Sequence, residues 1–401
     1  MALEHLLKHH WFFRDPFETW MAEDERASLG SWFVEPPFLR TLLGDTTPVH
    51  KQYVARSDLV FGRRGTGKTA LRIRLEDELT SNAPQVMVAR YVDFGPALQE
   101  GSSPSMRSHV EEILRLATGE LIGYLAEDIE RYKKLTLGQK SELFGLIRHY
   151  FDALPTEIRT RYQAELSPIA GRVGIVATKL GKSAIDLYNG VLNVIRGEKI
   201  EPASWAPDMS TSPIYPITRL ERFNGLSRAA GIDSIWVMVD GIDEAPGVRS
   251  PGEIFDCVSG ILLSQRLIEF REGNRQTICF KIFLTHPQEL KPILKGKDFR
   301  FDRISCHEIT LNRVDLDRAL VGRLAHFSTG RVKSFDTLCQ QDARTTHDRL
   351  LDESDERPRT LFRMCHEILS AFNRNDQTNS PLLDRKSIDE GIAKAQAAAT
   401  G

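Results

Sequence analysis

The sequence predicts an α/β fold in which helices cover both faces of a parallel sheet. Short apolar runs, the signature of buried strands, recur at 58–61, 86–92, 235–240 and 277–285. A helix-like stretch, 254–270, separates the last two runs, as a crossover connection requires. Strands that are apolar throughout are typical of parallel sheets, because crossover helices bury both of their faces. We therefore expect a three-layer architecture.

The composition is that of an ordinary soluble globular chain. Of 401 residues, 41% are hydrophobic and 27% are charged, which excludes disordered and fibrous classes. The 53 basic and 55 acidic side chains nearly cancel, so no chain-wide basic field indicates nucleic acid as the default partner. The five cysteines include no CxxC pair, so neither a zinc finger nor a disulfide framework is predicted. A reducing, cytoplasmic location fits this pattern best.

The first 55 residues are predicted to be an aromatic segment packed on the domain that follows. Three of the five tryptophans (Trp11, Trp20 and Trp32) lie here among prolines that interrupt long helices. The first eleven residues carry charges where a secretory signal needs an apolar run. We expect neither export nor a transmembrane segment.

A glycine-rich loop after the first strand is the strongest motif. Gly62-x-x-x-x-Gly67-Lys68-Thr69 matches the complete Walker A template, which places backbone N–H groups and a lysine around phosphates and a hydroxyl on Mg²⁺. The alternative is a chance glycine turn, which the order of strand, loop and helix argues against. Lys68 is also a candidate catalytic residue, and Thr69 a metal ligand. The candidate nucleotide-binding residues of the loop are Gly62, Arg63, Arg64, Gly65, Thr66, Gly67, Lys68, Thr69 and Ala70.

An acidic turn after the third apolar run supplies the carboxylates that a nucleotide site needs. Asp240 ends the run and is the candidate Mg²⁺ ligand, through water. Asp243 or Glu244, just beyond it, is the candidate base that orients or deprotonates the attacking water. The alternative is an ordinary acidic turn after a buried strand.

The two motifs together resemble the AAA+ group of P-loop ATPases, and within it the STAND, NACHT-like and origin-recognition-like classes. The acidic turn is similar to their Walker B motif, and the aromatic stretch that leads into the loop resembles that of several bacterial ATPases of unknown or antiviral role. The resemblance covers residues 30–95 and 232–373. One departure is that Asp240 lies much farther from Thr69 than in a minimal AAA+ core, so a helical insertion over about 100–230 is expected.

The resemblance implies further site residues. Thr285, at the end of the fourth run, matches the polar sensor of these ATPases, with strand capping as the alternative. Arg300 and Arg303 match the arginine finger that reaches a neighbouring subunit's nucleotide, with surface ion pairing to Asp298 or Asp302 as the alternative.

A second sensor is implied for the C-terminal helices. Pro358 marks a helix start, and Arg359 in that first turn needs an anion to offset the helix dipole. This anion is either a nucleotide phosphate or a nearby carboxylate, Asp355 or Glu356.

We expect three parts: the aromatic segment 1–55, a P-loop ATPase core over 56–310 with its insertion, and a helical lid over 311–401. Inside the insertion, 171–199 is basic and amphipathic. It fits an ordinary helix on the core, a membrane-surface helix, a loop that grasps a polymer, or a partner-binding surface. Charges interrupt any bilayer-spanning run.

The predicted function is Mg²⁺-dependent ATP binding and hydrolysis coupled to a change of shape or assembly. The resemblance implies a homo-oligomer in bacterial regulation or antiviral defence. The sequence shows no protease, nuclease or other effector signature beside the ATPase motifs, so we expect the output to pass to a separate effector protein. One alternative is a nucleotide-switched scaffold with negligible turnover. Another is a DNA-associated ATPase of the origin-recognition or clamp-loader kind, which has little support because the sequence shows no zinc site and no basic-aromatic tract.

Overall fold

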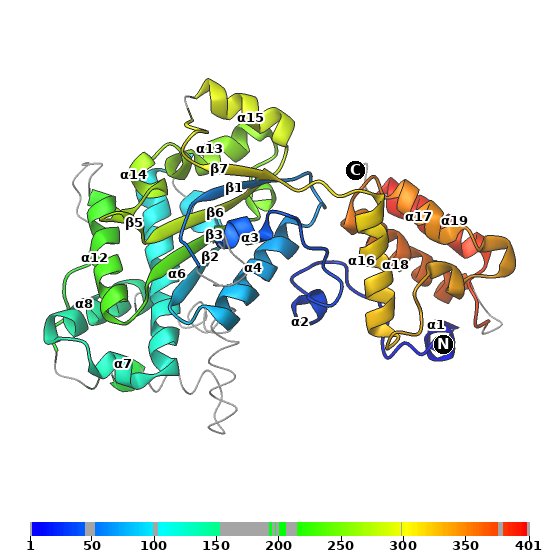
Figure 1. Ribbon diagram of the computed structural model, residues 1–401, viewed down its shortest axis with the longest axis horizontal. Coiled ribbons are helices and arrows are strands. Elements are labelled where there is room, and N and C mark those ends of the chain that lie inside the picture. The colour runs from blue at the N-terminus through cyan, green and yellow to red at the C-terminus, as the bar shows by residue number, and fades with distance from the viewer. Residues whose placement is uncertain are drawn as a thin grey trace.

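The molecule is built around a five-stranded sheet in which every strand runs parallel to its neighbours, in the order β2-β3-β6-β1-β7 (Figure 1). The strands are β1 (Asp58–Phe61), β2 (Val86–Tyr91), β3 (Ser234–Val239), β6 (Ile278–Leu284) and β7 (Ser305–Glu308). The computed structural model describes residues 2–44, 53–98, 103–152, 192–194, 197, 200–205, 215–297, 299–375 and 380–398. The predicted α/β fold with a parallel sheet is confirmed.

Helices pack on both faces of this sheet because side chains alternate along each strand. Phe61 and Val237 belong to the apolar core on one face, whereas Val60 and Trp236 belong to the core on the other. The first face is covered by α6 (Met106–Glu127), α12 (Tyr215–Ala229), α13 (Pro251–Leu262) and α15 (Pro287–Gly296). The second is covered by α3 (Leu39–Leu43) and α4 (Lys68–Asn82).

The helices between β2 and β3 contribute to the core of the sheet. Ile113 and Leu121 of α6 lie in the same apolar core as Met87 and Ala89 of β2. We expected the insertion to be added to a core that is already complete without it. Helix α6, within that insertion, instead forms part of the layer that covers the sheet. Residues 153–191 and 206–214, with most of the amphipathic segment 171–199, lie outside the described part.

The C-terminal helices form a second group, joined to the sheet by the extended chain after β7 (Figure 1). They are α16 (Arg313–Phe327), α17 (Thr346–Glu353), α18 (Pro358–Asn375) and α19 (Arg385–Ala397). Helix α18 begins at Pro358 as predicted, and Leu361, Met364, Cys365 and Ile368 form its buried stripe. Residues 311–375 and 380–398 are thus largely helical.

The N-terminal segment departs from its prediction in two ways. It begins with the helix α1 (Ala2–His9), which the aromatic and proline-rich pattern did not predict. Its first part packs on the C-terminal helices and not on the sheet, since Leu6 and Phe17 are buried in the core of α16 and α18. Only its later part, which includes α2 (Arg26–Leu29) and α3, packs against α4.

Shorter elements complete the described chain. Helical ones are α5 (Gly95–Leu98), α7 (Ile129–Lys133), α8 (Leu137–Ile147), α14 (Gln265–Ile268), the π-helix Arg148–Asp152 and 3₁₀ turns at Ile242–Glu244, Phe335–Leu338 and Gln341–Ala343. A small antiparallel hairpin joins β4 (Arg271–Glu272) and β5 (Arg275–Gln276). Within the described ranges, every helix is too short or too polar to cross a bilayer.

Candidate functional site

The glycine-rich loop connects the carboxyl end of β1 to the first turn of α4. Gly65 (φ +85°) and Gly67 (φ +95°) have left-handed backbones, which a side chain would strain. The Gly62 N–H donates to the carbonyl of Leu284 at the end of β6 (3.0 Å), so the loop leaves the sheet at a fixed point. The turn is closed by the Thr66 hydroxyl, which donates to the Arg63 carbonyl (2.8 Å).

Lys68 is buried in the middle of this loop. Its Nζ donates to the carbonyls of Gly62 (3.0 Å) and Arg63 (3.2 Å). Burial lowers the pKa of the Lys68 ammonium, and the carboxylates of Asp243 and Asp240 oppose that shift. Among the described residues, no carboxylate pairs directly with the Lys68 ammonium, and Asp243 and Asp240 act on it across the site.

Asp240 lies directly after β3, and its carboxylate contacts a guanidinium. Arg72 of α4 donates from Nε to Asp240 Oδ2 at 3.0 Å. The Arg72 side chain is fully buried and the Asp240 side chain is 5% exposed. Such a charge-assisted hydrogen bond offsets part of the free-energy cost of burying a carboxylate.

The two acids beyond Asp240 lie among arginines. Gly241 adopts a left-handed backbone (φ +77°), after which Asp243 and Glu244 occupy a short 3₁₀ turn. Arg64 of the loop lies 3.9 Å from Asp243 and 4.0 Å from Glu244. Arg359 lies 3.8 Å from Glu244.

Arg359 joins α18 to the loop. Its backbone N–H contacts the Gly65 carbonyl (3.4 Å), and a Cβ added to Gly65 would lie 3.2 Å from the Arg359 Cβ. The carboxylate nearest its guanidinium is Glu244; Asp355, one of the expected partners, pairs with Arg357 instead (2.5 Å).

These residues surround a cavity of about 640 Å³, a size typical of small-molecule sites. Its wall combines loop residues, acids, arginines and aromatic rings. They come from the N-terminal segment, from the sheet with its loops and helices, and from the start of α18. From the predicted set it includes Arg64, Gly65, Gly67, Lys68, Thr69, Ala70, Asp240, Asp243, Glu244 and Arg359. The wall also holds residues that were not predicted: Trp20, Glu23, Trp32, Arg72, Arg90, Arg115 and Phe362.

Six predicted residues lie outside that wall. Gly62, Arg63 and Thr66 belong to the glycine-rich loop, and the other three are Thr285, Arg300 and Arg303. Thr285 is buried at the end of β6, and its hydroxyl has no hydrogen-bond partner within the described part of the chain. Arg300 pairs with Asp302 at the surface (2.8 Å), and Arg303 lies 3.7 Å from Glu269. Asp298, the other partner considered for these arginines, lies outside the described residues.

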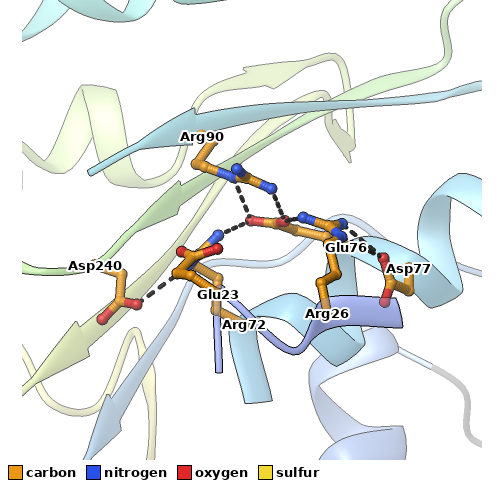
Figure 2. Close-up of polar contacts among 7 residues, drawn as sticks. All are labelled: Glu23, Arg26, Arg72, Glu76, Asp77, Arg90 and Asp240. Atoms are coloured by element: carbon orange, nitrogen blue, oxygen red, sulfur yellow. Dashed lines mark hydrogen bonds and ion pairs between the residues drawn. The ribbon is translucent and has the colours of Figure 1, made fainter. Parts of the chain in front are cut away.

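A cluster of buried charges borders the cavity at α4 (Figure 2). The guanidinium of Arg72 contacts Glu76 on its own helix and Glu23 on the N-terminal segment, besides Asp240. Glu76 also accepts from Arg90 (2.6 Å) and Arg26 (2.9 Å). Burial alone would raise the pKa of the Glu76 carboxyl, but these arginines lower it to about 2. We name this group of residues, which also includes Asp77, the Arg72 cluster.

No protein-family model matches the sequence, and no curated protein matches it either. Conclusions about function therefore depend on the chemistry of the cavity.

Proposed function

We propose that this chain binds ATP with Mg²⁺ in the cavity and hydrolyses it, as a P-loop ATPase of AAA+ or STAND type. The observation that carries the proposal is the position of Lys68, Thr69 and Asp240 around one space. A cation, a hydroxyl and a carboxylate at a glycine-rich helix N-terminus are the groups that a metal-bound triphosphate requires.

The residues on the wall fit this ligand. Gly65 and Gly67, both with left-handed backbones, lie on the cavity wall beside the first turn of α4, whose N–H groups carry partial positive charge that favours phosphate. Trp20, Trp32 and Phe362 provide rings against which a purine can stack. Thr69 and Asp240 would hold Mg²⁺, which supplies charge compensation at the phosphoryl oxygens.

The hydrolytic step needs a base near the terminal phosphate. Glu244 and Asp243 both border the cavity, and Glu244 is the more exposed, with half of its side chain accessible. Glu244 would orient the attacking water, while Lys68 and Arg359 stabilise negative charge on the phosphoryl group. Arg300 and Arg303 are proposed to act only in an assembly, from a neighbouring subunit.

A nucleotide-switched scaffold with slow turnover is the second candidate. The observation in its favour is that Glu244 lies between two arginines, Arg64 at 4.0 Å and Arg359 at 3.8 Å. In that position the two guanidinium groups compete with an attacking water for the oxygens of the Glu244 carboxylate, which would slow hydrolysis. In either case we propose that the output passes to a separate effector protein.

The proposal is tested by Lys68→Ala. We expect ATP affinity to fall by about 10- to 100-fold, since a hydrogen bond to a charged group contributes about 1.5–3 kcal/mol. Glu244→Gln should retain ATP affinity and lose turnover. Calorimetry and phosphate release measure the two effects, and Lys133→Ala, at an exposed ion pair on α7, is the control. Unchanged affinity in folded Lys68→Ala protein would contradict the proposed site. If Asp243→Asn loses turnover and Glu244→Gln does not, Asp243 is the base.

A further inference from the structure

One guanidinium connects the proposed metal ligand to the N-terminal segment. Three different nitrogens of Arg72 contact three carboxylates: Nε contacts Asp240, Nη1 contacts Glu76 and Nη2 contacts Glu23 (Figure 2). Asp240 follows β3, Glu76 lies on α4, and Glu23 precedes α2. Arg72 is therefore shared among three elements that border the cavity.

The Arg72 cluster contains more carboxylates than cations. Glu23, Glu76, Asp77 and Asp240 face Arg26, Arg72 and Arg90, which leaves one excess negative charge. Arg72 and Glu76 are fully buried, so their attraction is only weakly screened by water. The Glu23 side chain is 45% exposed. Of the three carboxylates that contact Arg72, it therefore has the lowest free-energy cost for breaking this contact and being hydrated instead.

The chain around Glu23 connects two groups of helices. Arg26 pairs with Glu76 and Asp77 on α4 (2.9 and 2.6 Å). Glu25, between them, is buried and pairs with Arg323 of α16 in the C-terminal group (2.6 Å). The segment 23–26 thus holds α4 through its outer residues and α16 through Glu25.

We propose that Arg72 is a positioning residue that couples metal occupancy at Asp240 to the contact of Glu23 with α4. The inference rests on the proposed function, since it takes Asp240 as the Mg²⁺ ligand. A cation bound at Asp240 withdraws that carboxylate's charge from Arg72, which leaves the guanidinium to Glu23 and Glu76. Metal loading and docking of the segment 23–26 therefore stabilise each other, and the coupling is reciprocal.

The first test is Glu23→Gln, which removes the charge of a half-exposed side chain. Without the Glu23 charge, Arg72 is directed more strongly at Asp240, which becomes a poorer metal ligand. We expect affinity for the non-hydrolysable analogue AMP-PNP, measured by calorimetry, to fall about fivefold or more in Mg²⁺ and to stay unchanged in EDTA. Asp24→Asn removes the same charge at the adjacent exposed residue, outside the cluster, and should change neither value.

The outcomes separate this inference from the proposed function. Equal affinities of Glu23→Gln and wild type in Mg²⁺, or an equal loss in Mg²⁺ and EDTA, would overturn the inference alone. If the wild-type protein binds no AMP-PNP under either condition, the proposed function is wrong and the inference with it.

The reciprocal effect is tested by hydrogen exchange of the backbone amides in residues 20–30. In wild type, AMP-PNP with Mg²⁺ should slow their exchange relative to AMP-PNP with EDTA. In Glu23→Gln that metal-dependent difference should disappear, whereas in Asp24→Asn it should remain. Equal metal-dependent protection in Glu23→Gln and wild type would contradict the coupling.

Discussion

Charged side chains are buried near both ends of the central sheet, and the two groups are built differently. Near the amino ends of the strands, Asp58 of β1 pairs with Lys281 of β6, its partner in the strand register. Both side chains are fully buried, and the Lys281 Nζ lies 4.6 Å from the centre of the Trp236 ring. His307 donates from Nε2 to the same carboxylate at 3.2 Å.

The Arg72 cluster, at the carboxyl ends, differs in its balance of charge and in its access to the cavity. Cations are in excess around Asp58, because its carboxylate also accepts from Arg56 (3.0 Å), and neither Asp58 nor Lys281 borders the cavity. The Arg72 cluster, in contrast, has an excess carboxylate and reaches the cavity wall. The fully buried contact of Asp58 with Lys281 supports the register of β1 and β6. A shared guanidinium beside a cavity has several partners, so a ligand can redistribute its contacts.

The largest expected effect comes from breaking the enclosed pair. Lys281→Met leaves Asp58 without its main buried partner and should lower the free energy of unfolding by about 3–5 kcal/mol, measured by urea titration. Replacing both residues, as Asp58→Leu with Lys281→Met, should restore most of that loss because no charge remains buried without its partner. A double variant no more stable than Lys281→Met would show that this pair is not the source of the loss.

The second effect is a pH dependence that sharpens the contrast. The folded pKa of Glu76 is about 2, below its ordinary value of 4.5, so its stabilisation is present above about pH 4.5 and is lost as the pH falls toward 2. The loss is about 3 kcal/mol over that range. Urea unfolding of Glu76→Gln between pH 5 and pH 2 should show a correspondingly smaller decline than wild type. An equal decline would assign the acid sensitivity to other groups, such as Asp58, whose pKa is also lowered.

The smallest effect on stability is expected at exposed pairs, in contrast to both buried groups. Arg300→Ala removes a surface contact with Asp302, so the midpoint of urea unfolding should not change measurably. If Arg300 acts on a neighbouring subunit, its loss should lower ATP turnover about 10³-fold, and wild-type turnover per subunit should rise with protein concentration. Arg313→Ala, at another exposed pair, is the control. Turnover of Arg300→Ala equal to that of the control would contradict a finger role for Arg300.

Most of the fold could be predicted because buried strands have an apolar sequence. β1, β2 and β6 lie within the predicted apolar runs, and β3 begins one residue before its predicted run. β7 has the sequence Ser-Cys-His-Glu and is partly exposed at the sheet edge, so neither composition nor alternation predicts it. The N-terminal segment packs on α16 and α18, which are distant in the sequence. Local sequence patterns cannot predict a contact of this kind.

The candidate site could be predicted only where its residues are contiguous. The loop and the acidic turn are local patterns, and the structure places most of their residues around one cavity. Arg72 and Glu76 carry a sequence signal, because two opposite charges four apart occupy buried positions of an otherwise apolar helix face. Their partners Glu23 and Asp240 come from distant segments, and only the tertiary structure brings them together.

The packing of residues 2–17 on the C-terminal helices has a consequence for biosynthesis. Leu6, Phe12 and Phe17 leave the ribosome long before the helices that bury them are translated. Until those helices emerge, these side chains lack their native partners, so the nascent chain carries an apolar segment that chaperones can bind. The C-terminal helices complete their apolar core only when the first segment returns, which makes closure of this core a late event in folding.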